Sequence, residues 1–159
     1  MEYKSEKYRQ DVLHPLKFKW GMLKMLPSAV FWGFKVVSLD ENKCAVSIPY
    51  SWRTQNPFKS IYFAALAGAA ELSTGALCQM YLSDRSPHSM LVIGFRAEYS
   101  KKANSKIVFT CDQGLELGKL LDSFDKSGDH GSLEMISIGK NEKGEEVARA
   151  FISWSFKKK

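Results

Sequence analysis

The chain has 159 residues, 45% hydrophobic and 25% charged, a composition typical of one folded domain that needs no disulfide or metal to hold it together. Its net charge of +6 is compatible with an anionic partner, but no nucleic-acid motif accompanies it, so no nucleic-acid partner is expected. The three cysteines, Cys44, Cys78 and Cys111, lie far apart and outside any CxxC or Cys/His cluster. This spacing argues against a disulfide framework and a metal site, and no cofactor is expected.

The N-terminal part of the chain shows no signal-peptide pattern, because its first residues mix both charges and lack an apolar stretch. We therefore expect a cytoplasmic protein. Because residues 1–12 are polar, we also expect them to be poorly ordered. Residues 13–26 form an amphipathic helical pattern, with Pro15 in its first turn and Pro27 after its end. Such a helix either packs over the domain's own core, which we favour, or lies on a membrane surface. Its apolar stripe comprises Leu13, Leu16, Trp20, Leu23 and Leu26.

The middle of the chain predicts a β-hairpin followed by one long helix. Residues 34–39 and 43–48 are rich in valine and isoleucine and flank a turn-forming Asp-Glu-Asn sequence. Residues 61–82 are almost entirely apolar or small, which is long enough to suggest a membrane span. Glu71 near the midpoint argues against a transmembrane segment, because a charge is costly in lipid. A helix that is apolar all round is expected inside a soluble core.

The rest of the chain is predominantly β. Residues 107–111 alternate, residues 133–138 and 147–156 predict a hairpin, and residues 115–124 are either a short helix or an irregular crossover. We expect residues 157–159 to form a solvated basic tail. In the strand over residues 91–99, one face is expected to hold Leu91, Ile93, Phe95, Ala97 and Tyr99.

The order of elements is helix, two strands, one buried helix and about four further strands. An antiparallel sheet wrapped around the buried helix satisfies every apolar face. We therefore predict an α+β protein with the hot-dog fold, in which residues 13–156 form a single domain preceded by the amphipathic helix.

Glu71 is the most unusual residue of the sequence, because a carboxylate inside an apolar helix costs several kcal/mol unless it is protonated or paired. The same surroundings produce a competent general base or nucleophile. The alternative is a structural role, in which Glu71 caps a loop or pairs with an arginine such as Arg53 or Arg96.

The segment from Asn56 to Glu71 resembles the core motif of hot-dog acyl-CoA thioesterases of the phenylacetic-acid-degradation type. That motif reads N-x2-G-x2-H-G-G-x6-D, and Asn56 and Glu71 are separated by the same fifteen residues. The segment FRAEYSKKA, residues 95–103, also resembles a strand and turn of these enzymes. At the other motif positions this chain carries Lys59 for the first glycine, Tyr62 for the histidine, and Phe63 and Ala64 for the paired glycines.

The resemblance implies an active site with named roles. Backbone N–H groups of Phe63 and Ala64 would form an oxyanion hole at the helix start, with Tyr62 replacing the histidine as a thioester-binding group. Glu71 would activate water or attack the carbonyl, and Asn56 would help to position water or the thioester.

The resemblance also implies an oligomer. Residue 62 and Glu71 lie nine residues apart, about 13 Å along one helix, so they cannot meet on one substrate atom within a chain. The site would lie between subunits of a homodimer, or of a tetramer built from two dimers. The basic turn that holds Lys101, Lys102 and Lys106 is a weaker prediction for contacts with the phosphates of coenzyme A.

Three functions remain open on the sequence. The first is a thioesterase that hydrolyses acyl-CoA or a similar acyl thioester. The second is a non-catalytic module that binds acyl-CoA or lipid, which the missing histidine and glycines favour. The third is a basic surface that binds a membrane or nucleic acid through residues 13–26.

Overall fold

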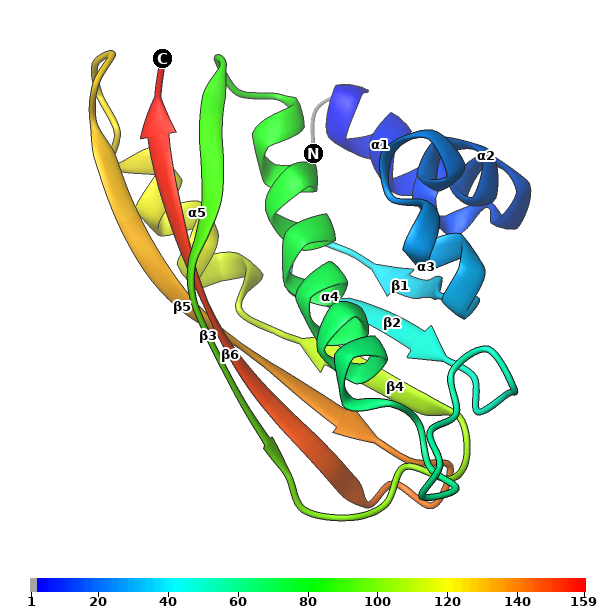
Figure 1. The fold of residues 1–159 in the computed structure, drawn as a ribbon. Helices are drawn as coiled ribbons and strands as arrows, with labels where there is room; N and C mark the ends of the chain where they lie inside the picture. Colours follow the sequence, from blue (N-terminus) through cyan, green and yellow to red (C-terminus); the bar gives the residue numbers. More distant parts are fainter. Residues whose placement is uncertain (1–2) are drawn as a thin grey trace.

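A computed structural model describes residues 3–159 as a six-stranded antiparallel sheet curved around one long helix (Figure 1). The strand order in the sheet is β1-β2-β4-β5-β6-β3. This is the predicted hot-dog arrangement, and it is confirmed. The helices are α1 (Tyr3–Leu13), α2 (Pro15–Met25), α3 (Pro27–Trp32), α4 (Phe63–Ser83) and α5 (Gly114–Asp122). The strands are β1 (Lys35–Leu39), β2 (Cys44–Ile48), β3 (His88–Tyr99), β4 (Ile107–Cys111), β5 (His130–Lys140) and β6 (Glu146–Lys158).

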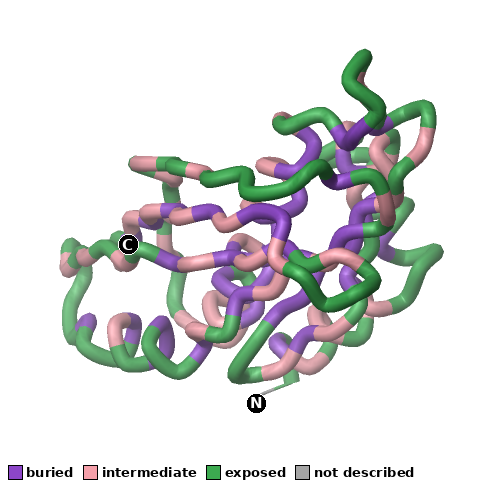
Figure 2. Tube along the Cα trace, turned by 90° about the horizontal axis from the view of Figure 1, so that it is seen from below, coloured by how far each residue is buried: buried purple, intermediate pink, exposed green. Residues whose placement is uncertain are grey.

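Helix α4 forms the centre of the core and contacts β2, β4, β5 and β6. Small side chains bring it close to the sheet, since Ala65, Ala69 and Ala70 are fully buried. Leu77 is also fully buried, and burying a leucine contributes about 2 kcal/mol. Buried residues (purple in Figure 2) gather where the strands and the long helix meet. No helix within residues 3–159 is long and apolar enough to cross a membrane.

Buried hydroxyl groups join α4 to the sheet. The Ser73 hydroxyl lies 2.7 Å from the Ser137 hydroxyl of β5 and donates to the Ala70 carbonyl. The indole N–H of Trp154 on β6 donates to the Thr74 hydroxyl at 2.9 Å. Each of these polar groups has its partner inside the protein, so its burial carries little penalty.

Strand β3 differs from the predicted alternation. A β-bulge between Val92 and Gly94 inserts one extra residue, Ile93, opposite β6. The bulge changes the phase of alternation, so Leu91 lies on the outer face while Phe95 lies on the inner face, opposite buried Ile152. The prediction that Leu91, Ile93, Phe95, Ala97 and Tyr99 share one face is therefore wrong at its first two residues.

The predicted helix over residues 13–26 is also different in the structure. His14 caps the start of α2 with its ring nitrogen, Leu26 has a non-helical backbone, and α3 begins at Pro27. Phe18 is the buried side chain of α2, whereas four residues of the predicted inward stripe are exposed to solvent. The exposed members are Leu16, Trp20, Leu23 and Leu26.

Within residues 3–159, helix and strand extend nearer to both ends than the sequence predicted. Residues 1–2 lie outside the described part, but residues 3–13 form α1, whose first turn is fixed by the Asp84 carboxylate. That carboxylate accepts the N–H groups of Lys4 and Ser5 at 3.0 and 3.1 Å. At the other end β6 continues to Lys158, whose ammonium group donates to two backbone carbonyls, so residues 157 and 158 of the predicted tail belong to the sheet.

Replacing glycine by alanine should have opposite effects on stability at two positions of the chain. Gly114 of α5 lies against the β1–β2 turn, whereas Gly21 of α2 lies in open space. A methyl group added at Gly114 would lie 1.9 Å from the Glu41 carbonyl oxygen, whereas one added at Gly21 in α2 meets nothing within 4 Å. We expect Gly114→Ala to lower the free energy of unfolding by at least about 3 kcal/mol, because backbone must move. Gly21→Ala should raise it by up to about 1 kcal/mol through helix propensity.

Chemical denaturation of both variants beside the wild type measures these changes. A Gly114→Ala protein as stable as the wild type would show that α5 does not pack against the turn as described.

Candidate functional site

A cavity of about 590 Å³ lies at the start of α4, between the loop that precedes the helix and the end of β3. It collects most residues that the sequence singled out, although Ala64, Glu71 and Lys106 do not line it. Tyr99 also lines the cavity, although no sequence motif marks this residue. The predicted site residues on its wall are Asn56, Tyr62, Phe63, Lys101 and Lys102.

Asn56 organises the loop before α4. Its side-chain oxygen accepts hydrogen bonds from the Phe58 and Ser60 N–H groups and from the Ser60 hydroxyl, at 3.0–3.2 Å. Its amide group donates to the Ile61 carbonyl at 3.4 Å. The Asn56 side chain is thus occupied within its own loop and fixes the path of the chain into the helix.

Lys59 adopts a left-handed backbone conformation, with φ of 57°. This is the position at which the resembled motif has a glycine, the residue that adopts this conformation without steric cost. The loop therefore keeps the shape that the glycine would allow, and the lysine carries a penalty of about 1 kcal/mol.

The first turn of α4 presents unpaired backbone donors. The Tyr62 N–H donates to the Thr54 carbonyl at 2.7 Å, whereas no partner occurs among the described residues for the N–H groups of Phe63 and Ala64. Helix geometry leaves such N–H groups without an intrahelical acceptor and gives this end of the helix a partial positive charge.

Three aromatic rings surround this end of the helix. The Phe63 ring is 56% exposed and packs edge-on against Tyr62 and Tyr99, with centroid distances of 4.9 and 6.4 Å. The Tyr99 hydroxyl donates to the Phe63 carbonyl at 3.2 Å, which joins β3 to the helix start. The alternation of β3 could have suggested an inward Tyr99, but no motif marked it as part of a site.

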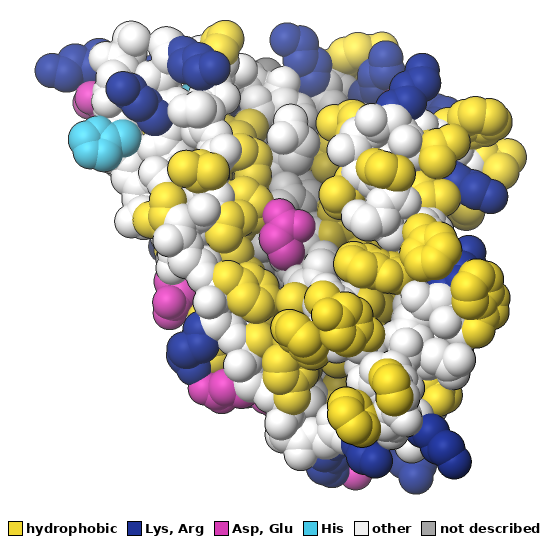
Figure 3. Space-filling view, viewed as in Figure 1, with side chains coloured by type: hydrophobic (Ala, Val, Ile, Leu, Met, Phe, Trp, Pro, Cys, Tyr) yellow, Lys and Arg dark blue, Asp and Glu magenta, His cyan; other side chains and the backbone are white. Residues whose placement is uncertain are grey.

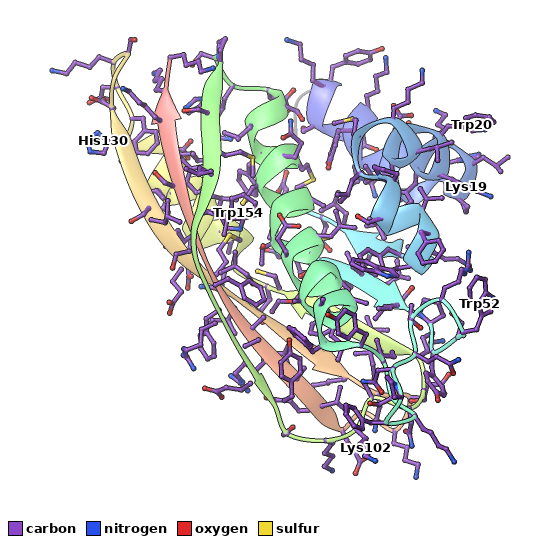
Figure 4. All side chains as sticks on the ribbon, in the orientation of Figure 1. Lys19, Trp20, Trp52, Lys102, His130 and Trp154 are labelled. Carbon is purple, nitrogen blue, oxygen red and sulfur yellow. The ribbon has the colours of Figure 1, made fainter. Side chains whose placement is uncertain are left out.

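The three lysines of the basic turn differ in their surroundings. Lys101 forms an ion pair with Glu145 at 2.8 Å, and Lys106 lies 3.7 Å from Glu142. Lys102 has no carboxylate partner in the described part of the chain and donates weakly to the Phe58 carbonyl at 3.4 Å. In Figure 4 its side chain points outward at the same end of the molecule. Lys102 is therefore the lysine most available to an anion.

Glu71 is half-buried on the side of α4 that the sheet leaves open. Glu71 is the acidic residue of α4, and Figure 3 shows hydrophobic side chains gathered over this face of the molecule. No hydrogen bond or ion pair to its carboxylate occurs within residues 3–159; Arg96 pairs with Glu98 instead. Burial alone raises the pKa of Glu71 above its ordinary value.

The immediate surroundings of Glu71 are small and aromatic. A methyl group added at Gly75 would lie 3.3 Å from the Glu71 carboxylate and 3.4 Å from the Trp154 ring, so glycine leaves the carboxylate room on the helix surface. The Thr74 hydroxyl, which receives the Trp154 N–H, donates to the Glu71 carbonyl at 2.9 Å. Figure 4 shows Trp154 directed at the middle of α4.

The open side of α4 connects the two parts of the site. Along one face of α4, residues at helical spacing are only partly buried. Most of those near Glu71 have small side chains. Between Phe63 and Glu71 the helix rises about 12 Å, so the two parts lie apart within one chain. The stripe consists of Ala64, Ala67, Gly68, Glu71, Gly75 and Gln79.

The sequence matches one protein family, described as a domain of unknown function, DUF4442, over residues 16–156. No protein with a curated description matches the chain in sequence. A protein of unknown function from Chlorobaculum tepidum has the same fold, with a TM-score of 0.75 and 15% identity over 93% of this chain and 99% of its own.

Two further solved structures carry a functional description. A probable thioesterase from Pseudomonas aeruginosa superposes with a TM-score of 0.74 and 16% identity over 92% of this chain and 98% of its own. A thioesterase from Haemophilus influenzae does so with a TM-score of 0.66 and 11% identity over 90% of both chains. At these identities the similarity shows a shared fold.

The raised pKa of Glu71 predicts a pH-dependent stability difference for Glu71→Gln. Below the ordinary value of 4.5 both side chains are neutral, and the two proteins should be about equally stable. As the pH rises from 4.5 through the raised pKa, the folded wild type holds its proton more tightly than the unfolded chain, so it loses stability. At neutral pH we expect Glu71→Gln to be more stable by about 1 kcal/mol.

Denaturant titrations of both proteins at acidic and neutral pH measure this difference, with Gln79→Ala on the same stripe as a control. A wild type that gains stability relative to Glu71→Gln as the pH rises would mean that the carboxylate has a stabilising partner.

Proposed function

The chain belongs to the DUF4442 family, and we propose that it is a hydrolase that cleaves acyl thioesters such as acyl-CoA. The observation that carries the proposal is Glu71, a half-buried carboxylate without a partner among the described residues, on the open side of a buried helix. A carboxylate held in this way is poised to take a proton rather than to stabilise the fold. The fold that the chain shares with a probable thioesterase and a thioesterase from two bacteria supports the assignment by analogy.

In the proposed reaction, Glu71 takes a proton from water as the water oxygen attacks the thioester carbonyl. The carbonyl oxygen becomes an oxyanion, which the N–H groups of Phe63 and Ala64 stabilise with the positive end of the α4 dipole. When the tetrahedral intermediate collapses, the carbon–sulfur bond breaks, and the thiolate receives the proton that Glu71 holds. The products are a carboxylic acid and a free thiol, and Glu71 returns to its starting state.

The site requires two copies of the chain, because Glu71 and the Phe63 N–H lie about 12 Å apart along one helix. Strand β3 is at the edge of the sheet, so one side of its backbone is free to pair. Strand β3 runs antiparallel to α4, with Tyr99 at the start of the helix. Antiparallel pairing of two β3 strands would bring the α4 start of one copy toward the middle of α4 in the other.

Charge along β3 suits such pairing. Arg96 and Glu98 are exposed neighbours on the outer face. Pairing centred on Ala97 would place each arginine opposite the glutamate of the second copy, where opposite charges across strands are favourable. On the inner face it would bring Phe95 of one copy beside Tyr99 of the other.

The cavity at the helix start suits an apolar acyl group or the pantetheine arm of coenzyme A, because aromatic rings and Leu66 line it. Lys102 is the residue we assign to a coenzyme A phosphate. Lys101 and Lys106 are weaker assignments, since each is already neutralised by a glutamate.

The alternative is a module that binds an acyl thioester without cleaving it. The exposed Phe63 ring, held by Tyr62 and Tyr99, favours this alternative because it occupies the entrance that paired glycines would leave open. Saturable binding of acyl-CoA with no thiol release would support it.

A matched pair of variants tests the oxyanion donor. Phe63 is the first residue of α4, where proline is tolerated, and Tyr62 has the extended backbone (φ −60°, ψ 132°) that a following proline requires. Phe63→Pro removes the ring and the N–H donor, whereas Phe63→Ala removes only the ring. In thiol-release assays over short to long acyl-CoA chains, we expect kcat of Phe63→Pro to be about 10²–10³-fold below that of Phe63→Ala.

Glu71→Gln in the same assay should lose at least about 10²-fold in kcat, because glutamine cannot accept the proton. Wild-type turnover should rise with pH through the raised pKa of Glu71, as the basic form accumulates. Equal rates for wild type and Glu71→Gln would remove the catalytic role of this carboxylate. Absence of thiol release from every acyl-CoA tested, with binding retained, would favour the binding module.

Mixing two inactive variants tests whether the site is shared. A heterodimer of Glu71→Gln with Phe63→Pro has one site with both mutations and one with neither. Unfolding and refolding an equal mixture should restore about one quarter of the wild-type rate, since half of the dimers are mixed and each has one intact site. Light scattering checks that each variant is an oligomer. A monomeric protein, or a mixture as inactive as its components, would contradict the shared site.

A further inference from the structure

The N-terminal helices expose an apolar ridge that the fold does not use. On α2, Leu16, Trp20 and Leu23 follow one another at one-turn spacing, and they are 64%, 67% and 49% exposed. Met25 at the end of the helix is 81% exposed. Leu16, Trp20 and Leu23 point away from the core because Phe18, on the opposite side of α2, is the residue that anchors the helix. Figure 3 shows hydrophobic side chains gathered over these helices and bordered by basic ones.

The ridge continues beyond α2. Phe31 of α3 is half exposed and packs edge-on against Trp52, with ring centroids 6.1 Å apart. Trp52 is 74% exposed, and in Figure 4 both Trp20 and Trp52 project away from the body of the molecule on the same side. Large apolar side chains exposed together mark an interaction surface on a soluble domain.

The charge around the ridge has one sign. The chain contains no Asp or Glu between Asp11 and Asp40, and the lysines in this interval number four. Lys17 pairs with Asp11 at 2.6 Å, whereas the other three form no ion pair in the described part of the chain. The unpaired ones are Lys19, Lys24 and Lys35.

We propose that this face, the ridge of α2 and α3 with its lysines, docks on the surface of an anionic phospholipid bilayer. A helix with apolar residues on its outward side and lysines beside them lies in the plane of a membrane interface, with its apolar side chains in the headgroup region. Tryptophan suits this depth because its ring is apolar and its N–H is polar. The lysines gain from anionic headgroups, and their long stems reach the surface from the flanks of the helix.

Charge favours a bilayer over a second copy of this chain. Two such faces packed on each other would bring uncompensated lysines together, and no carboxylate on either ridge would pair with them. An anionic lipid surface supplies both the apolar layer and the negative charge that the face lacks. The inference does not depend on thioester hydrolysis, since neither Glu71 nor the start of α4 belongs to the face.

Vesicle co-sedimentation of the full-length protein tests the proposal, with vesicles of phosphatidylcholine alone and of phosphatidylcholine mixed with phosphatidylglycerol. We expect binding to the mixed vesicles that weakens as salt is added. Trp20→Ser/Leu23→Ser and Lys19→Glu/Lys24→Glu should each lower the partition coefficient at least about tenfold.

Two controls match these changes elsewhere on the surface. Leu115→Ser removes a leucine that is 60% exposed on α5, and Lys126→Glu/Lys143→Glu changes the net charge by the same amount as the ridge lysine variant. The partition coefficient of both controls should lie within about twofold of the wild-type value. The lower net charge of the lysine control also weakens long-range attraction to the vesicle, and added salt screens this effect. All substituted side chains are exposed, and a thermal unfolding curve confirms that each variant folds.

Three outcomes would overturn the proposal. One is that the wild type does not bind mixed vesicles at low salt. Another is that the ridge variants bind as well as their controls. Alternatively, light scattering would show that Trp20→Ser/Leu23→Ser dissociates an oligomer that binds no vesicles, which would make the ridge a contact between copies of the chain.

Discussion

The burial of α4 against the curved sheet is the constraint on which the rest of the structure depends. A helix that is apolar on almost every side needs cover from several strands, and only a sheet that curves around it supplies that cover. Buried alanines let the helix approach the strands, and the hydroxyl groups of Ser73 and Thr74 find partners on β5 and β6. The sheet ends at β3, so one side of the helix remains open, and this side carries Glu71.

The same geometry separates the two halves of the proposed active site. The helix start offers unpaired N–H groups beside a cavity, and the carboxylate lies about two turns farther along. Since a rigid helix cannot bring them together, the proposed chemistry requires a second chain. The free edge of β3 provides a place for that chain, and the edge would be a liability for aggregation if it stayed uncovered.

The N-terminal helices complete the core with few side chains. Phe18 and Val12 are buried, while the opposite side of α2 gains nothing from the fold because no further element of the described chain covers it. An apolar and basic surface of this kind costs solubility unless it has a partner. If it rests on a lipid surface, an enzyme for acyl thioesters would work close to the place where amphiphilic acyl compounds gather.

Hydrophobic periodicity determined much of this protein from its sequence alone. The hairpin of β1 and β2, the extent of α4, the last hairpin and the order of strands followed from local patterns, and they led to the hot-dog fold. Glu71 was recognisable because a charge in an apolar helix is anomalous without any structural knowledge. The spacing from Asn56 to Glu71 supplied the resemblance, and a left-handed Lys59 at the glycine position is consistent with it.

Only the tertiary structure decided which faces are covered and which side chains are already occupied. The bulge at Ile93 moved Leu91 to the outer face, and a single inserted residue of this kind leaves no periodic signal. The sequence favours an inward orientation for the helical stripe from Leu13 to Leu26, yet a sequence does not tell whether anything lies opposite an apolar stripe. Asn56 is predicted from its position in the motif and Lys101 from its charge, but their hydrogen-bonding capacity is used by Ser60 and Glu145. Periodicity reports that a face is apolar, whereas the partners of that face come from distant parts of the chain and are fixed only when the whole fold assembles.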